Sequence, residues 1–73
     1  MMPLTLAPTD QGFVVYKIFA DQKLKAHLDH LGILVGSEIT PLIFCGKDLI
    51  VRVKDCRLAL NKEVASKILV KAV

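Results

Sequence analysis

The quartet His27-Leu28-Asp29-His30 holds both histidines of the chain, with an aspartate between them. Imidazole nitrogens and carboxylate oxygens bind zinc and other transition metals, so this quartet is the first candidate for chemistry. The surrounding residues predict a helix, in which successive side chains are turned by about 100°. His27 and His30 then lie on one side, whereas Asp29 falls on the opposite flank. The three side chains therefore cannot converge on one ion while the segment is helical.

His27 and His30 alone can approach each other, because they are three residues apart on the same helix. Two ligands are too few for zinc, since a structural site takes four protein ligands and a catalytic site takes three. A third would have to come from elsewhere in the chain or from a second molecule. We therefore expect no required cofactor, and at most weak divalent metal binding by His27 and His30. The simpler interpretation is that His27 packs against the rest of the domain while His30 interacts favourably with the helix dipole.

The other residues that could do chemistry are not arranged for it. Cys45 and Cys56 are separated by ten residues, which matches no zinc-binding spacing, and no CxxC pair is present. We predict ordinary core or sheet positions for both cysteines. No histidine lies at a spacing from Ser37 or Ser66 that would indicate a catalytic serine–histidine pair. The glycines are spread out as turn residues, without the lysine of a phosphate-binding loop.

Length and composition predict one small domain over residues 1–73. Of the 73 residues, 53% are hydrophobic and 23% charged, so the chain can bury one thin core, and disorder is not expected. The net charge of +3 is mild, its basic residues are not clustered and aromatic residues are few, so no nucleic acid is expected as a partner. The alternative is a small basic β-barrel that binds nucleic acid through Arg52, Lys54 and Arg57.

Neither a membrane span nor a secretory signal is visible in the sequence. No apolar run approaches the ~20 residues that cross a bilayer. The opening residues 1–9 lack the basic start and long apolar centre of a signal peptide. We expect a cytoplasmic protein without a membrane span.

The segment that carries the histidines is predicted to be a helix over 21–31. Asp21 can cap its N-terminus, and leucines recur at i, i+4 and i+7 from Leu24 to Leu31, the spacing of a helix with one apolar face. Gly32 follows at the place where helices commonly end in the left-handed conformation.

The rest of the chain has the pattern of short strands. β-Branched and aromatic residues favour a strand over 12–20, and alternation is clearest over 47–55. The further predicted elements are a strand over 35–46 with an edge position or bulge at Pro41, a short strand over 56–60, a helical turn over 62–67 capped by Asn61, and a closing strand over 68–73. The fold class is therefore mainly β: a small SH3-like barrel of about five strands, with one inserted α-helix and a short helical turn before the last strand.

The loop after the predicted helix is unusually apolar. Ile33, Leu34 and Val35 stand between two glycines, and in so small a barrel one or two of them should stay exposed. An exposed apolar patch is a candidate partner surface. The alternative is that all three side chains plug the mouth of the barrel.

Two segments resemble a known family. "HLDHLGILVGSEITPL" is similar to the "LxxLGxxxGxxI" segment of the FeoA family, the small cytosolic proteins of bacterial ferrous iron uptake, and "IVRVKDCRLALNKEVASKILV" resembles that family's ending. The resemblance covers roughly residues 3–71. It implies an SH3-like barrel without catalytic activity that associates with FeoB, the membrane iron permease with a cytosolic GTPase domain.

The partner surface expected from the loop and the resemblance comprises Ile33, Leu34, Val35 and Arg57. The sequence departs from the family pattern at Val35, where proline is common, at a shortened hairpin over 46–48, and at Asn61, where a basic residue is common. The same barrel ends longer iron-dependent repressors, but we expect a free-standing protein here. A metal-responsive regulatory module is a further alternative, and formation of a homo-oligomer is left open.

Overall fold

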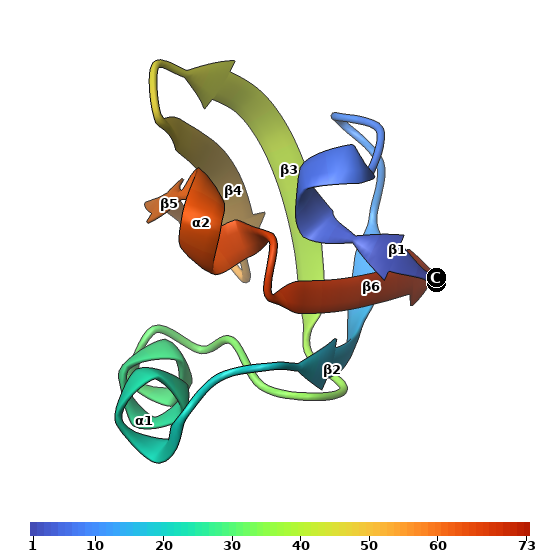
Figure 1. Cartoon of the computed structure of the whole chain (residues 1–73). Coiled ribbons are helices and arrows are strands. Elements are labelled where there is room, and N and C mark those ends of the chain that lie inside the picture. The colour runs from blue at the N-terminus through green and yellow to red at the C-terminus, as the bar shows by residue number, and fades with distance from the viewer.

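Each of the six strands pairs antiparallel with its neighbours, in the order β1-β6-β2-β3-β4-β5 (Figure 1). The computed structural model describes all residues, 1–73. The elements in chain order are β1 (Met2–Pro3), the 3₁₀-helix η1 (Leu4–Leu6), β2 (Phe13–Ile18), α1 (Gln22–His30), β3 (Glu38–Cys45), β4 (Asp48–Val53), β5 (Cys56–Asn61), α2 (Lys62–Ala65) and β6 (Ile68–Ala72). The structure confirms the predicted class: mainly β, consistent with an SH3-like barrel, with one inserted helix and a helical turn before the last strand.

The long strand β3 joins the two halves of the barrel. Its first residues, Glu38 and Ile39, pair with β2, and from Thr40 onward it pairs with β4 instead. The ladder shifts by one residue between Pro41 and Ile43. Because proline cannot donate a ladder hydrogen bond, a bulge is one of the few places it fits inside a sheet. Of the two predicted positions for Pro41, the structure therefore shows the bulge.

The core consists of the inward side chains of the sheet. On β4, Leu49, Val51 and Val53 are buried while Arg52 is exposed, as the alternation predicts. Phe13 on β2 is among the largest fully buried side chains. Every one of the buried residues is apolar or proline, and no polar or charged side chain is buried. The barrel is thus held mainly by hydrophobic burial.

A short helix follows each edge strand in the chain: η1 follows β1, and α2 follows β5. α2 packs against η1 and against β5. Asn61 caps α2 as predicted, since its Oδ1 accepts a hydrogen bond of 2.7 Å from the Glu63 N–H. The prediction missed β1 and η1, which add a sixth strand and bury Leu4 completely.

Helix α1 begins and ends at the predicted signals. The Asp21 carboxylate accepts a hydrogen bond of 2.8 Å from the Leu24 N–H. At the other end the Gly32 N–H donates to the Asp29 carbonyl and the Ile33 N–H to the Leu28 carbonyl, at 2.9 and 2.8 Å. This is the Schellman arrangement, with Gly32 left-handed at a φ of 89° and Ile33 buried like Leu28. The cap therefore sends the chain from α1 back into the core.

We expect replacement of Gly32 by alanine to destabilise the protein by about 1–2 kcal/mol, because a Cβ is strained in the left-handed conformation. The added Cβ would also lie 3.4 Å from Val53 Cγ1. For a chain of this length each kcal/mol lowers the thermal midpoint by about 4–8 °C. Circular dichroism melting measures it. Gly12→Ala is the matched control, since Gly12 has no positive φ and a Cβ there would lie at an ordinary 3.5 Å from Val73 Cγ2. Equal midpoints for the two variants would contradict the strain argument.

Candidate functional site

An apolar groove of about 330 Å³ runs between α1, the end of β2 and the loop that follows α1. We call it the α1 groove. It is lined by Lys17, Ile18, Lys25, Ala26, Asp29, Ile33, Leu34 and Val35. Figure 1 shows α1 lying off one end of the barrel. An apolar hollow of this kind can accept side chains of another molecule.

The loop is fixed so that two of its three apolar residues face outward. Ile33 is 1% exposed, whereas Leu34 and Val35 are 45% and 65% exposed. This confirms the prediction that one or two of the three stay outside. The side chain of Ile33, which is also among the predicted contact residues, belongs to the core and forms the inner wall of the groove.

Hydrogen bonds hold the loop in this conformation. The Leu34 N–H donates to Ser37 Oγ at 3.2 Å, and the Ser37 N–H donates to the Leu34 carbonyl at 3.0 Å. The Gly36 N–H donates to the Val15 carbonyl of β2 at 2.8 Å. The exposed side chains of Leu34 and Val35 are therefore presented by an ordered turn, which lowers the entropy that a partner would have to remove on binding.

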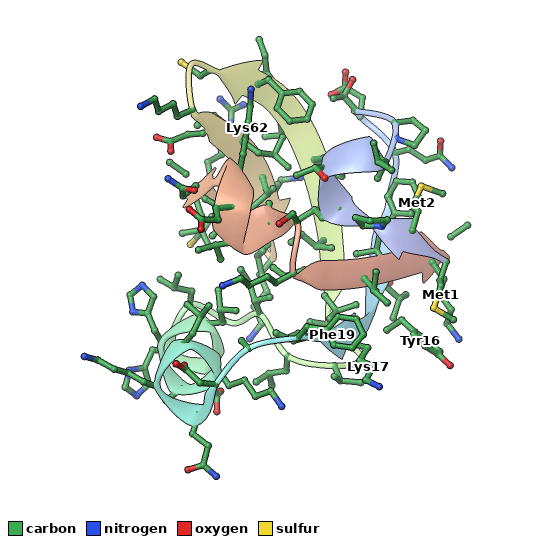
Figure 2. The ribbon with its side chains drawn as sticks, viewed as in Figure 1. Met1, Met2, Tyr16, Lys17, Phe19 and Lys62 are labelled. Atoms are coloured by element: carbon green, nitrogen blue, oxygen red, sulfur yellow. The ribbon has the colours of Figure 1, made fainter.

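The rim of the groove carries more positive than negative charge. Lys17 and Lys25 line it together with one carboxylate, Asp29. Lys17 Nζ also lies 4.9 Å from the centre of the Phe19 ring, and the two side chains lie together at the end of β2 in Figure 2. Phe19 is 52% exposed. A segment with apolar anchors and flanking acidic residues would complement this surface.

Sequence reasoning missed the lysines of the groove. Lys25, Ala26 and Asp29 lie on one face of α1, at i, i+1 and i+4, and this helical spacing was the available signal. Lys17 gave none, because its position depends on how α1 packs against the end of β2.

The predicted metal ligands stay apart from other ligands. His27 and His30 lie exposed in the last turn of α1. No group of three or more His, Cys, Asp and Glu side chains comes together anywhere in the chain. Cys45 and Cys56 occupy sheet positions, as predicted, but both thiols are exposed and free, so the core alternative for them is wrong.

Arg57 is not part of the α1 groove. It lies on β5, directly opposite Arg52 of β4, and its side chain is exposed. The predicted partner residues thus divide into two surfaces: Leu34 and Val35 at the groove, and Arg57 on the sheet.

Comparison with known proteins gives one family and one fold. A family model described as FeoA domain matches residues 2–72. No match among curated protein sequences is significant. Neither helix is long and apolar enough to span a bilayer.

Solved structures share the fold. A crystal structure of an iron uptake regulatory protein (FeoA) superposes with a TM-score of 0.85 at 23% identity, over 96% of this chain and 93% of that one. The NMR structure of the FeoA protein from Chlorobium tepidum gives 0.90 at 20% identity, over 99% and 70%. ScaR with bound Zn²⁺ gives 0.89 at 19% identity, over 100% of this chain but 37% of ScaR. At these identities the likeness establishes the SH3-like fold alone.

Proposed function

Because this chain belongs to the FeoA domain family, which associates it with iron transport, we propose that it is a non-enzymatic, cytoplasmic accessory protein of bacterial ferrous iron uptake. It acts by contact with a FeoB-type membrane permease that carries a cytosolic GTPase domain. Membership of the family supports a role in iron uptake. The exposed surface of the molecule supports action by protein–protein contact.

The observation that carries the proposal is the α1 groove. Leu34 and Val35 are held outward by the hydrogen bonds of their turn, beside a hollow rimmed by Lys17 and Lys25. Exposed apolar side chains that are ordered rather than collapsed are a feature of protein contact surfaces. The non-enzymatic part of the proposal rests on the FeoA domain match, because FeoA is not a known enzyme family.

The alternatives drawn from the sequence stay predictions. A metal-responsive module would need a third ligand for His27 and His30, which the same chain does not bring near them. A nucleic-acid role would depend on the cations Arg52, Lys54 and Arg57, of which the two arginines face each other across β4 and β5.

We expect Leu34→Asp to weaken capture of the cytosolic part of the permease by about tenfold or more, since a charge at a contact centre is desolvated without a partner. The thermal midpoint should change little, because Leu34 is 45% exposed. Pull-down with and without guanine nucleotide measures the capture, and melting measures the fold. Leu6→Asp is the matched control, since Leu6 is 72% exposed on η1 and does not line the groove. Full capture by Leu34→Asp would refute the groove as the contact surface.

A further inference from the structure

A row of polar side chains crosses three strands on the outer face of the sheet. Thr40 of β3 lies directly opposite Arg52 of β4, and Arg52 lies directly opposite Arg57 of β5. Both arginines are exposed. None of the side-chain hydrogen bonds in the structure involves either guanidinium. Two guanidinium groups therefore lie side by side, and their N–H donors make no hydrogen bond within the protein.

This pairing works against the stability of the barrel. Side chains directly opposite across antiparallel strands have Cβ atoms about 4.5–5.5 Å apart, and like charges at that separation repel. The repulsion would be relieved by an anion held between Arg52 and Arg57. The arrangement thus resembles a site that is complete only when it is occupied.

A polar hollow of about 300 Å³ lies beside the row. It is lined by Gly32, Ser37, Glu38, Thr40, Arg52, Val53 and Lys54. Lys54 adds a third cation, and the hydroxyls of Thr40 and Ser37 add donors. Ser37 Oγ already accepts from the Leu34 N–H, so its own hydrogen is left to donate. Glu38 is the one carboxylate of the lining, against the two cations Arg52 and Lys54. Arg57 lies outside the lining, opposite Arg52 on β5.

We propose that this surface binds a phosphoryl group with at least three terminal oxygens, either inorganic phosphate or a phosphate monoester. We call it the β4 anion site, formed by Thr40, Arg52, Lys54 and Arg57. A tetrahedral dianion presents three or four acceptors, which suits donors from three strands and a turn, and guanidinium groups bind phosphate oxygens in pairs. A carboxylate has two oxygens in one plane and would use only one guanidinium group fully. The site shares no lining residue with the α1 groove and does not depend on the proposed function.

The first experiment is a titration with inorganic phosphate, followed by amide chemical shifts at constant ionic strength in chloride. We expect Arg52→Gln to weaken binding by about tenfold, since one charge-assisted pair of hydrogen bonds is lost. Glu38→Gln should strengthen binding about threefold, because the one repelling carboxylate is removed. Lys67→Gln is the control: it deletes an exposed cation outside the site. Equal affinities in all four proteins, or acetate binding as tightly as phosphate, would overturn the proposal.

Thermal melting gives an independent test, because the difference between the midpoints of the wild type and Arg57→Gln should change sign between chloride and phosphate. In chloride, Arg57→Gln should melt slightly above the wild type, because the repulsion from Arg52 is gone. In phosphate the wild type should melt above Arg57→Gln, because a ligand of the folded state stabilises it by mass action. A general salt effect of phosphate would raise both midpoints equally. An equal rise would overturn the site.

The source of the phosphoryl group is decided by three further probes. Adenosine monophosphate and phosphatidylcholine vesicles containing phosphatidic acid offer monoesters, free and in a membrane. A single-stranded oligonucleotide blocked at both ends offers phosphodiesters only. Binding of either monoester supports the site and identifies its source. Tighter binding of the oligonucleotide than of phosphate, with a steep salt dependence, would overturn the proposal in favour of a nucleic-acid surface.

Discussion

Leu28→Ala should release α1 from the barrel while the barrel itself stays folded. Leu28 is the one buried side chain of the helix, and Leu24 and Leu31 are only partly buried. Loss of a buried leucine costs about 2–5 kcal/mol. A helix of nine residues is not stable without packing. The destabilisation should therefore fall on α1, which lies off the end of the barrel in Figure 1.

Amide hydrogen exchange distinguishes this local opening from global unfolding. Protection in Gln22–His30 should fall about 30-fold or more, whereas protection in β4 should hold. Capture of the permease should fall with it, because α1 forms one wall of the groove. Leu24→Ala is the control, with a smaller effect expected from a half-buried side chain. Equal loss of protection in helix and strands would mean that α1 unfolds only together with the barrel.

The elements that could be predicted are those specified by neighbouring residues. The helix expected over 21–31 occupies 22–30, because its cap, its leucine spacing and its terminal glycine all lie within the segment. The alternation on β4 likewise needs no distant partner to be recognised. The secondary structure of a short segment can be predicted when its own residues all indicate the same element.

The elements that could not be predicted depend on distant residues. β1 has two residues, too few to show any period, and it forms because Met2 and Pro3 pair with Val70 and Leu69 of β6. The burial of Leu4 follows from that pairing and from α2. No pattern within the first eleven residues indicates it.

The exposure of Cys45 shows how one bulge changes a whole strand. Strict alternation from Ile39 would place Ile43 and Cys45 on the inner face. The bulge after Pro41 shifts the register by one residue, so that Ile43 is 61% exposed and Cys45 is exposed with it. Pro41 indicated a bulge from the sequence alone. The effect of the bulge on Cys45 could be known only from the register of β3 against β4.

The candidate sites divide in the same way. The exposed apolar loop was visible between its glycines, because Leu34 and Val35 are neighbours in the chain. The lysines of the α1 groove and the facing pair Arg52 and Arg57 were not, because they are brought together by packing and by strand register. The spread of basic residues along the sequence gave no sign of a cationic row on the sheet.

Phe13→Ala should have the largest effect on folding of any variant considered. Phe13 is 1% exposed and pairs with both Ile39 of β3 and Ala72 of β6, so it lies where the two halves of the barrel meet. Removal of a buried phenylalanine costs about 3–5 kcal/mol. A chain of 73 residues has a total stability of about 4–11 kcal/mol at the usual value per residue. We therefore expect the thermal midpoint to fall by about 12 °C or more.

Urea unfolding followed by circular dichroism and hydrogen exchange measure the effect, with Phe19→Ala as the matched control at a side chain 52% exposed. The control should lose less than about 1 kcal/mol. In Phe13→Ala protection should fall together in β2, β3, β4 and β6, because these strands share one core. That pattern is the opposite of the one expected for Leu28→Ala. A loss confined to β2 and β6, with β4 still protected, would mean that the two halves of the barrel fold independently, with β3 as a linker rather than a shared strand.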